Sequence, residues 1–284
     1  MLQKTTLLLL CVLLNPPNLL AQDLRNRTEV MYPLGTVIIA KEPLPNRVYR
    51  SQKDKIIVSV TCFEKGTTNI VTSSSGTGFV SEVPGLIVSA RHLIKDGDYD
   101  HVFTGIIVTE KEWIRFPISL VAKGEPGKYK DIMVLRVDPI TMELAWAESI
   151  DVFDTNPYRL LLRTSEFADA KVDGKKVYIS GFSSTVGGYF DENNQDVSFL
   201  MDLINFTFPA EVTASITNMP VNKTGTKKIF RLLDSAEPGF SGGKVMNEDG
   251  KVIGMTVAAT TANNFIYVFS SQDIKQFFKN NRLK

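Results

Sequence analysis

Short apolar or alternating runs recur along most of this chain, and turn-forming residues separate them. Residues 132–137, for example, form a β-branched run that follows Glu125, Pro126 and Gly127. Runs of this length, bounded by glycine, proline or aspartate, are typical of β-strands. The pattern therefore predicts an all-β protein. The expected strands are 56–61, 78–83, 86–90, 103–108, 113–121, 132–137, 177–181, 206–216, 228–233, 252–258 and 265–269.

The two ends of the chain have other patterns. In residues 271–284, Ile274, Phe277 and Phe278 lie at i, i+3, i+4 spacing, which predicts an amphipathic C-terminal helix. Residues 22–51 contain three prolines, and we expect them to form an irregular N-terminal arm.

Residues 1–21 have the composition of a secretory signal peptide. Lys4 precedes the apolar run Leu7 to Leu14, and Ala21 offers a small residue at a cleavage site. The apolar run is too short to span a bilayer, so we expect no stable membrane insertion once the signal is removed. An uncleaved membrane anchor is the alternative interpretation.

Charge and cysteine content narrow the class of protein further. The chain has 32 Lys and Arg against 31 Asp and Glu, and removal of Lys4 with the leader would leave an even balance. Such a balance does not favour nucleic-acid or membrane-surface binding. Cys62 would be the only cysteine of the exported chain, so no intrachain disulfide could form, which suits a periplasmic or secreted bacterial protein. Two histidines and one cysteine form no metal-ligand motif, and we expect no metal or other cofactor.

A serine in a glycine-rich turn is the first candidate for chemistry. Residues 239–243 read Gly-Phe-Ser-Gly-Gly and precede a short apolar strand at 244–246. Glycines allow the main chain to turn sharply and leave N–H groups free to face a negatively charged oxygen. Ser241 is a weak nucleophile alone, so a base and an orienting acid must be found elsewhere.

Only two histidines can supply the base. His92 follows the apolar run 86–90 at the expected end of a strand, whereas His101 follows a charged, turn-like stretch and is expected on a surface loop. We therefore expect His92 to be the general base. Asp131, which opens the strand at 132–137, is the candidate acid. Its rivals Asp96, Asp98 and Asp100 all crowd the turn after His92 and belong to no expected strand.

Three motifs in this order resemble the trypsin-like, chymotrypsin-fold serine peptidases. Residues 76–80 read Gly-Thr-Gly-Phe-Val, residues 131–135 read Asp-Ile-Met-Val-Leu, and residues 238–243 read Pro-Gly-Phe-Ser-Gly-Gly. The bacterial HtrA/DegP-like branch is the most similar, and it also resembles this chain near 176–182, 247–255 and 264–271. The resemblance covers about residues 55–280.

This resemblance implies a fold and a domain division. We expect two antiparallel six-stranded β-barrels, at about 52–148 and 156–270, followed by the helix at 271–284. Residues 52–284 would then form one peptidase domain without a PDZ module.

The same resemblance implies a serine endopeptidase acting on proteins or peptides. Ser241 would be the nucleophile, His92 the base and Asp131 the acid, and the N–H groups of Gly239 and Ser241 would form the oxyanion hole. The substrate pocket would have Ser235 at its base and Val257 and Ala258 in its walls. None of the three is acidic, so we expect small or medium apolar P1 side chains rather than arginine or lysine.

One alternative enzyme class is excluded, and one departure from the family pattern keeps a non-enzymatic function open. The α/β-hydrolases need a histidine after the serine, and none follows Ser241. Phe240 stands where relatives have aspartate or asparagine, so we expect no trypsin-style zymogen switch. A catalytically silent homologue that binds peptides is the alternative function. The interval from Asp131 to Ser241 is also long, and we expect its surplus in loops at 189–226.

Overall fold

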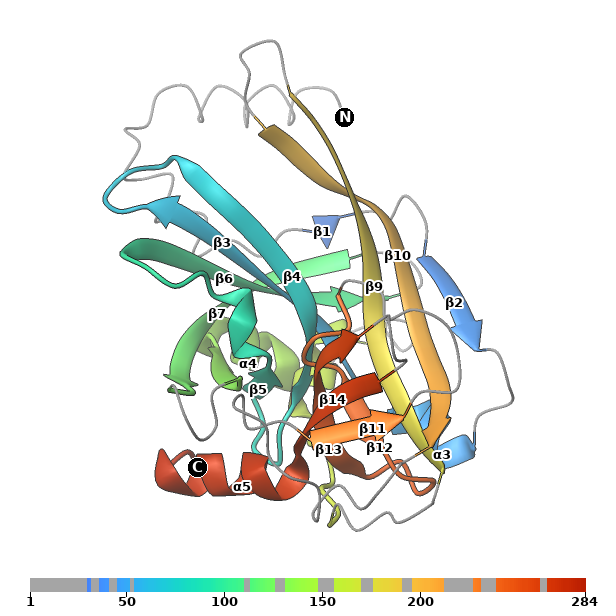
Figure 1. The fold of residues 1–284 in the computed structure, drawn as a ribbon. Helices are drawn as coiled ribbons and strands as arrows, with labels where there is room; N and C mark the ends of the chain where they lie inside the picture. Colours follow the sequence, from blue (N-terminus) through green and yellow to red (C-terminus); the bar gives the residue numbers. More distant parts are fainter. Residues whose placement is uncertain are drawn as a thin grey trace.

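The computed structural model of this protein consists of two groups of β-strands and a C-terminal helix (Figure 1). The structure describes residues 30–31, 36–40, 45–51, 54–109, 113–125, 131–147, 156–169, 176–190, 196–211, 227–230, 239–260 and 265–284. The expected signal peptide at 1–21 lies outside these ranges.

The first group of strands forms a closed six-stranded antiparallel barrel. Around the ring the strands follow the order β7, β6, β3, β4, β5 and β8, and β8 pairs back with β7. The first barrel expected from the sequence is therefore confirmed. Its strands are β3 (Ile56–Glu64), β4 (Ile70–Val80), β5 (Leu86–Ser89), β6 (Tyr99–Val108), β7 (Trp113–Lys123) and β8 (Met133–Val137).

Side-chain alternation explains how this barrel fills its interior. Ile56, Val58, Val60 and Cys62 alternate along β3, and all four are completely buried in the same cluster. Successive side chains of a strand point to opposite faces, so this spacing directs all four to one side. Cys62 thus acts as a small buried apolar residue.

The second group is a mainly antiparallel sheet with the strand order β11, β14, β13, β12, β9, β10 and β2, in which β2 runs parallel to β10. Figure 1 shows β9 and β10 as a long two-stranded ribbon that extends well beyond its neighbours. Part of the segment expected as loops at 189–226 is therefore strand. The strands are β2 (Thr36–Ala40), β9 (Lys176–Phe190), β10 (Asp196–Glu211), β11 (Lys227–Phe230), β12 (Lys244–Met246), β13 (Val252–Thr260) and β14 (Phe265–Ser270).

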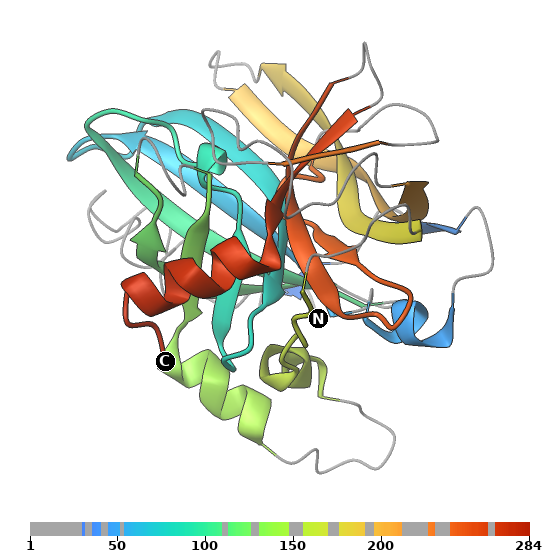
Figure 2. The same ribbon diagram turned by 60° about the horizontal axis from the view of Figure 1, so that its bottom comes forward.

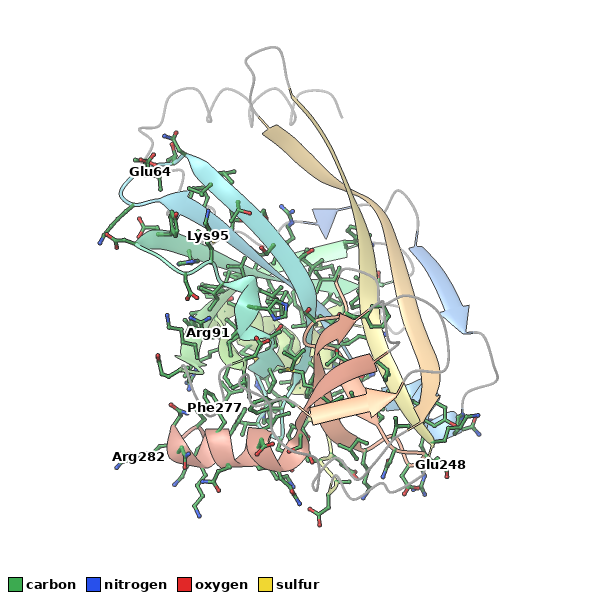
Figure 3. The ribbon with its side chains drawn as sticks, viewed as in Figure 1. Glu64, Arg91, Lys95, Glu248, Phe277 and Arg282 are labelled. Carbon is green, nitrogen blue, oxygen red and sulfur yellow. The ribbon has the colours of Figure 1, made fainter. Side chains whose placement is uncertain are left out.

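A shared core joins the two groups of strands to the C-terminal helix, α5 (Ser271–Asn280). Phe79 and Val134 of the barrel, Met255 and Phe269 of the second sheet and Phe277 of α5 belong to one buried cluster. In Figure 2, α5 lies across one end of the strands, and Figure 3 places Phe277 on the side of the helix that is turned toward them. The amphipathic helix predicted from the sequence is confirmed, although it ends four residues earlier.

Several elements were not expected from the sequence. The supposedly irregular arm contains β1 (Val30–Met31), which pairs with β7, as well as β2 and the helix α3 (Asn46–Ser51). A further helix, α4 (Pro139–Trp146), follows the barrel, and the 3-10 helices η1 (Arg91–Leu93) and η2 (Pro157–Leu162) are also present. None of the helices in the described ranges has both the length and the apolar composition of a membrane span.

Candidate active site

The structure brings His92, Asp131 and Ser241 together. His92 lies in η1, directly after β5, Asp131 precedes β8, and Ser241 precedes β12; the labelled Arg91 in Figure 3 marks the turn that carries the histidine. The Nε2 atom of His92 is 2.8 Å from Ser241 Oγ, and its Nδ1 atom is 3.0 Å from Asp131 Oδ2. A carboxylate only accepts hydrogen bonds, so Nδ1 carries the ring proton and Nε2 can accept the proton of the serine hydroxyl.

Strand pairing explains why the histidine and the aspartate meet. β5 and β8 are antiparallel neighbours, and Ser89 at the end of β5 pairs with Met133 at the start of β8. The chain beyond Ser89 and the chain before Met133 therefore leave the barrel at the same edge. His92 lies in the first segment and Asp131 in the second. The histidine side chain is 43% exposed and the aspartate side chain 13%, so the base faces solvent while the acid lies behind it.

The rival acids are engaged elsewhere. Asp96 forms an ion pair with Arg91, Asp98 pairs with Lys65, and Asp100 accepts a hydrogen bond from the N–H group of Gly66 at 3.0 Å. None of these three contacts involves His92.

The second histidine also lies apart from the serine. His101 belongs to β6 rather than to the expected surface loop. Its Nε2 atom donates to the carbonyl oxygen of Lys95 at 3.1 Å, and its ring stacks on Phe103. These contacts give His101 a structural role in the sheet.

Two glycines shape the turn that carries the serine, residues 239–243, which we call the nucleophile turn. Gly239 and Gly242 have φ angles of +100° and +88°, a region that L side chains rarely adopt. A Cβ atom on Gly242 would also lie 2.0 Å from the carbonyl oxygen of Thr77 in β4. The positive φ angles and the close approach to Thr77 both require glycine. The absence of a side chain at Gly242 lets the turn pack directly against the first barrel.

Phe240 is packed inside the protein. Its side chain is only 8% exposed, and a Cβ atom on Gly181 of β9 would meet its ring at 2.8 Å. The carbonyl oxygen of Phe240 accepts hydrogen bonds from Thr256 Oγ1 at 2.6 Å and from the N–H group of Gly243 at 2.8 Å. The nucleophile turn is thus held by its main chain, while the phenyl ring fills the space beside β9.

The expected substrate pocket is only partly described. Val257 of β13 is buried, and its carbonyl oxygen lies 3.5 Å from Ser241 Oγ, so this strand passes beside the serine. Ala258 continues β13 and pairs with Tyr267 of β14. Ser235 lies outside the described residues. The assignment of all three to the pocket stays a prediction.

Two buried lysines lie near the start of β12, and the sequence analysis did not identify them. Lys55 and Lys244 are 2% and 1% exposed; the Nζ atom of Lys55 donates to Ser180 Oγ at 2.6 Å, and that of Lys244 donates to the Ser51 carbonyl at 3.1 Å. Burial lowers the pKa of Lys244 to about 8, although Asp54 opposes this shift. Burial, together with the charge of Lys244, lowers the pKa of Lys55 well below its usual value.

Comparison with known proteins gives three results. Residues 76–255 match the family described as the trypsin-like peptidase domain. No curated protein sequence shows a significant match. Among solved structures, the inactive form of the Rv3671c protease has a TM-score of 0.50 and 14% identity, covering 86% of this chain and 98% of that chain. The active form of the same M. tuberculosis protease has a TM-score of 0.48 and 13% identity, covering 88% and 89%. The first likeness shows a shared fold.

Proposed function

Since this chain belongs to the trypsin-like peptidase family, we propose that it is a serine endopeptidase that cleaves proteins through His92, Asp131 and Ser241. The observation that carries the proposal is the continuous chain of contacts from Asp131 through the imidazole to Ser241 Oγ. A nucleophile within hydrogen-bond reach of a base, itself oriented by a third group, is the arrangement that activates serine.

Each residue has a defined role in the proposed reaction. Ser241 Oγ attacks the substrate carbonyl carbon while His92 Nε2 takes the hydroxyl proton, which gives a tetrahedral intermediate. As the C–N bond breaks, His92 returns that proton to the leaving amine, and an acyl-enzyme remains. Water then attacks the ester by the same route and releases the acid and the free serine. Asp131 keeps the proton on Nδ1 and stabilises the charged imidazolium in both halves.

The oxyanion hole would consist of the N–H groups of Gly239 and Ser241. Such donors stabilise negative charge on the tetrahedral intermediate, and one donor is typically worth about 3 kcal/mol at the transition state. The carbonyl oxygen of Phe240 is held by Thr256 and Gly243. In a trans peptide the C=O and N–H groups point in opposite directions, so the Ser241 N–H points away from these partners. This orientation supports its role as a donor.

Three finer inferences accompany this function. The second sheet closes into a barrel through β10 and β11, where Glu211 pairs with Phe230. The protein is exported with cleavage after Ala21, which sequencing of the mature N-terminus would test. The pocket accepts small or medium apolar P1 side chains, and equal cleavage after arginine and valine in a peptide library would contradict this.

Labelling with a fluorophosphonate probe, read by intact mass, tests the proposed activity. We expect one adduct on the wild-type protein and none on Ser241→Ala or His92→Ala. His101→Ala is the matched control, because it removes the other histidine and leaves the contacts of His92 intact, so it should label normally. If folded wild-type protein forms no adduct, the proposed serine peptidase activity is rejected. The peptide-binding alternative, which rests on Phe240, would then be tested by the binding of peptides without cleavage.

A further inference from the structure

We propose that two threonine hydroxyls, one from each group of strands, position the nucleophile turn for catalysis. Thr77 belongs to β4 of the first barrel and Thr256 to β13 of the second sheet, and they are 0% and 3% exposed. We call this pair the threonine clamp. The inference rests on the proposed peptidase function and identifies positioning residues that touch neither substrate nor reacting atoms.

Thr77 holds the turn at two points. Its hydroxyl donates to the carbonyl oxygen of Gly239 at 2.9 Å, and its main-chain N–H donates to the carbonyl oxygen of Ser241 at 2.8 Å. The hydroxyl oxygen also accepts a hydrogen bond from the N–H group of Phe182 in β9 at 2.9 Å. An amide N–H can only donate, so the single hydroxyl proton of Thr77 is directed to Gly239.

Thr256 holds the peptide unit between these two points. Its hydroxyl lies 2.6 Å from the carbonyl oxygen of Phe240 and 3.2 Å from that of Gly243, and the shorter contact takes the proton. The main chain of Thr256 is itself fixed against the turn, because its N–H donates to Gly243 and its carbonyl accepts from Gly242.

The clamp therefore fixes three consecutive peptide planes. The two hydroxyls hold the carbonyl oxygens of residues 239 and 240, and the main-chain N–H of Thr77 holds that of residue 241. A peptide unit is planar, so fixing a carbonyl also fixes the N–H group on the opposite side. The contact to Phe240 thereby orients the N–H of Ser241, which is a proposed oxyanion donor. Such donors are effective because they are already oriented toward the oxyanion before the reaction begins.

The side chain at position 240 explains why this chain needs the clamp. A phenyl ring can pack, as it does against Gly181, but it can form no ion pair or strong hydrogen bond that would anchor the turn. The hydroxyls instead act on the main chain directly. The two threonines come from different groups of strands, so the shape of the turn depends on the relative position of both groups.

Isosteric substitutions test the clamp. Thr77→Val and Thr256→Val keep the shape of the side chain and remove the hydroxyl, whereas Thr77→Ser and Thr256→Ser keep it. At increasing fluorophosphonate concentration, we expect the maximal labelling rate to fall about 10- to 100-fold in the valine variants, less than for outright loss of a donor. The half-saturating concentration should stay within about twofold, and the serine variants should recover most of the rate.

A matched control separates positioning from general destabilisation. Thr141 of α4 is also a buried threonine, and its hydroxyl donates a hydrogen bond to the carboxylate of Asp138, away from Ser241. Thr141→Val should lower the melting temperature but leave the labelling rate of the folded protein unchanged. If a valine variant at position 77 or 256 does not fold, the threonine is replaced by serine and by alanine instead. The difference in labelling rate between these two variants then isolates the effect of the hydroxyl.

A second readout does not depend on activity. Amide hydrogen exchange of a peptide spanning 239–243 should accelerate about tenfold in the valine variants and not in the serine variants, because the held carbonyls lose a partner. Normal labelling and normal exchange in both valine variants would overturn the clamp. Wild-type protein that does not label, but whose turn loosens in the valine variants, would reject the proposed peptidase and retain the clamp as a structural device.

Discussion

The carboxylate of Asp131 holds His92 through both its ring and its main chain. Asp131 Oδ2 lies 3.0 Å from the ring Nδ1, and Oδ1 accepts the main-chain N–H of His92 at 2.9 Å. The orientation of the imidazole and the position of the turn that carries it therefore depend on one side chain.

Asp131→Asn should abolish most activity without unfolding the protein. The remaining amide oxygen can still accept the His92 N–H, whereas the amide nitrogen would face the ring and favour the tautomer with its proton on Nε2. That nitrogen could then no longer accept the serine proton. We expect kcat to fall about 10⁴-fold, as expected for loss of the correct tautomer. A melting temperature close to the wild type, measured in parallel, would show that the loss is chemical. Activity within tenfold of the wild type would contradict the assigned role of Asp131.

Gly242→Ala should destabilise the fold through the nucleophile turn. The added methyl group would meet the Thr77 carbonyl at 2.0 Å, and φ at this position is +88°. The combined clash and strain should lower the free energy of unfolding by about 2–4 kcal/mol, measured by urea denaturation. Gly66→Ala is the matched control, because Gly66 also has a positive φ but its Cβ would meet no atom within 4 Å. An equal loss in both variants would show that strain alone, without the close approach to Thr77, accounts for the effect.

The stability of the wild-type protein should depend on Lys244 at alkaline pH. Burial lowers its pKa to about 8, whereas an unfolded lysine titrates near 10.4. Between these values the unfolded state binds more protons, so the contribution of Lys244 to stability rises with pH and is lost as pH falls through 8. The rise amounts to about 3 kcal/mol, an upper limit for one group.

Lys244→Met tests this dependence, since it keeps the packing of the long side chain and removes the charge. The difference in unfolding free energy between variant and wild type should favour the variant at pH 7 and shrink as pH is raised to 10.5. The variant also loses the hydrogen bond to Ser51, which lowers its free energy of unfolding at every pH. This loss does not alter the slope of the difference against pH. Lys251→Met, in the turn before β13, is the matched control, because it removes a lysine charge from a partly exposed position. A pH-independent difference for Lys244→Met would reject the prediction.

Local patterns in the sequence predicted the strands of the barrel and singled out His92 and Asp131 as candidate site residues. Every second residue of β3 from Ile56 to Cys62 is apolar and buried, β5 is a continuous buried run, and His92 and Asp131 lie at the ends of apolar runs. Family resemblance supplied the pairing of those strands, which no local pattern reveals.

Other features were missed, either because the apolar pattern misleads or because the contacts are long-range. The helix α4 buries Thr141 and Ala145 while Ile140 is 71% exposed, so its apolar residues do not mark the buried face. A local signal did exist: Asp138 caps the helix by accepting N–H groups at 2.9 and 3.2 Å, and Pro139 follows it. The threonine clamp depends on contacts between residues far apart in the chain. The roles of Thr77 and Thr256 therefore become visible only in three dimensions.

The buried phenyl ring at position 240 predicts that no internal cleavage is needed for activity. A trypsin-style switch uses a carboxylate at this position to bind a newly formed N-terminus, and Phe240 has no such group. Its ring is already packed beside Gly181, and the turn is held through its main chain. We expect protein beginning at Gln22, as well as protein with a short N-terminal extension, to label with fluorophosphonate at the same rate. Intact mass of the labelled species should show the adduct on the uncut chain. An adduct found only on chains cleaved well inside the mature sequence would show that a fresh N-terminus is required, and the turn would then need a partner other than the two threonines.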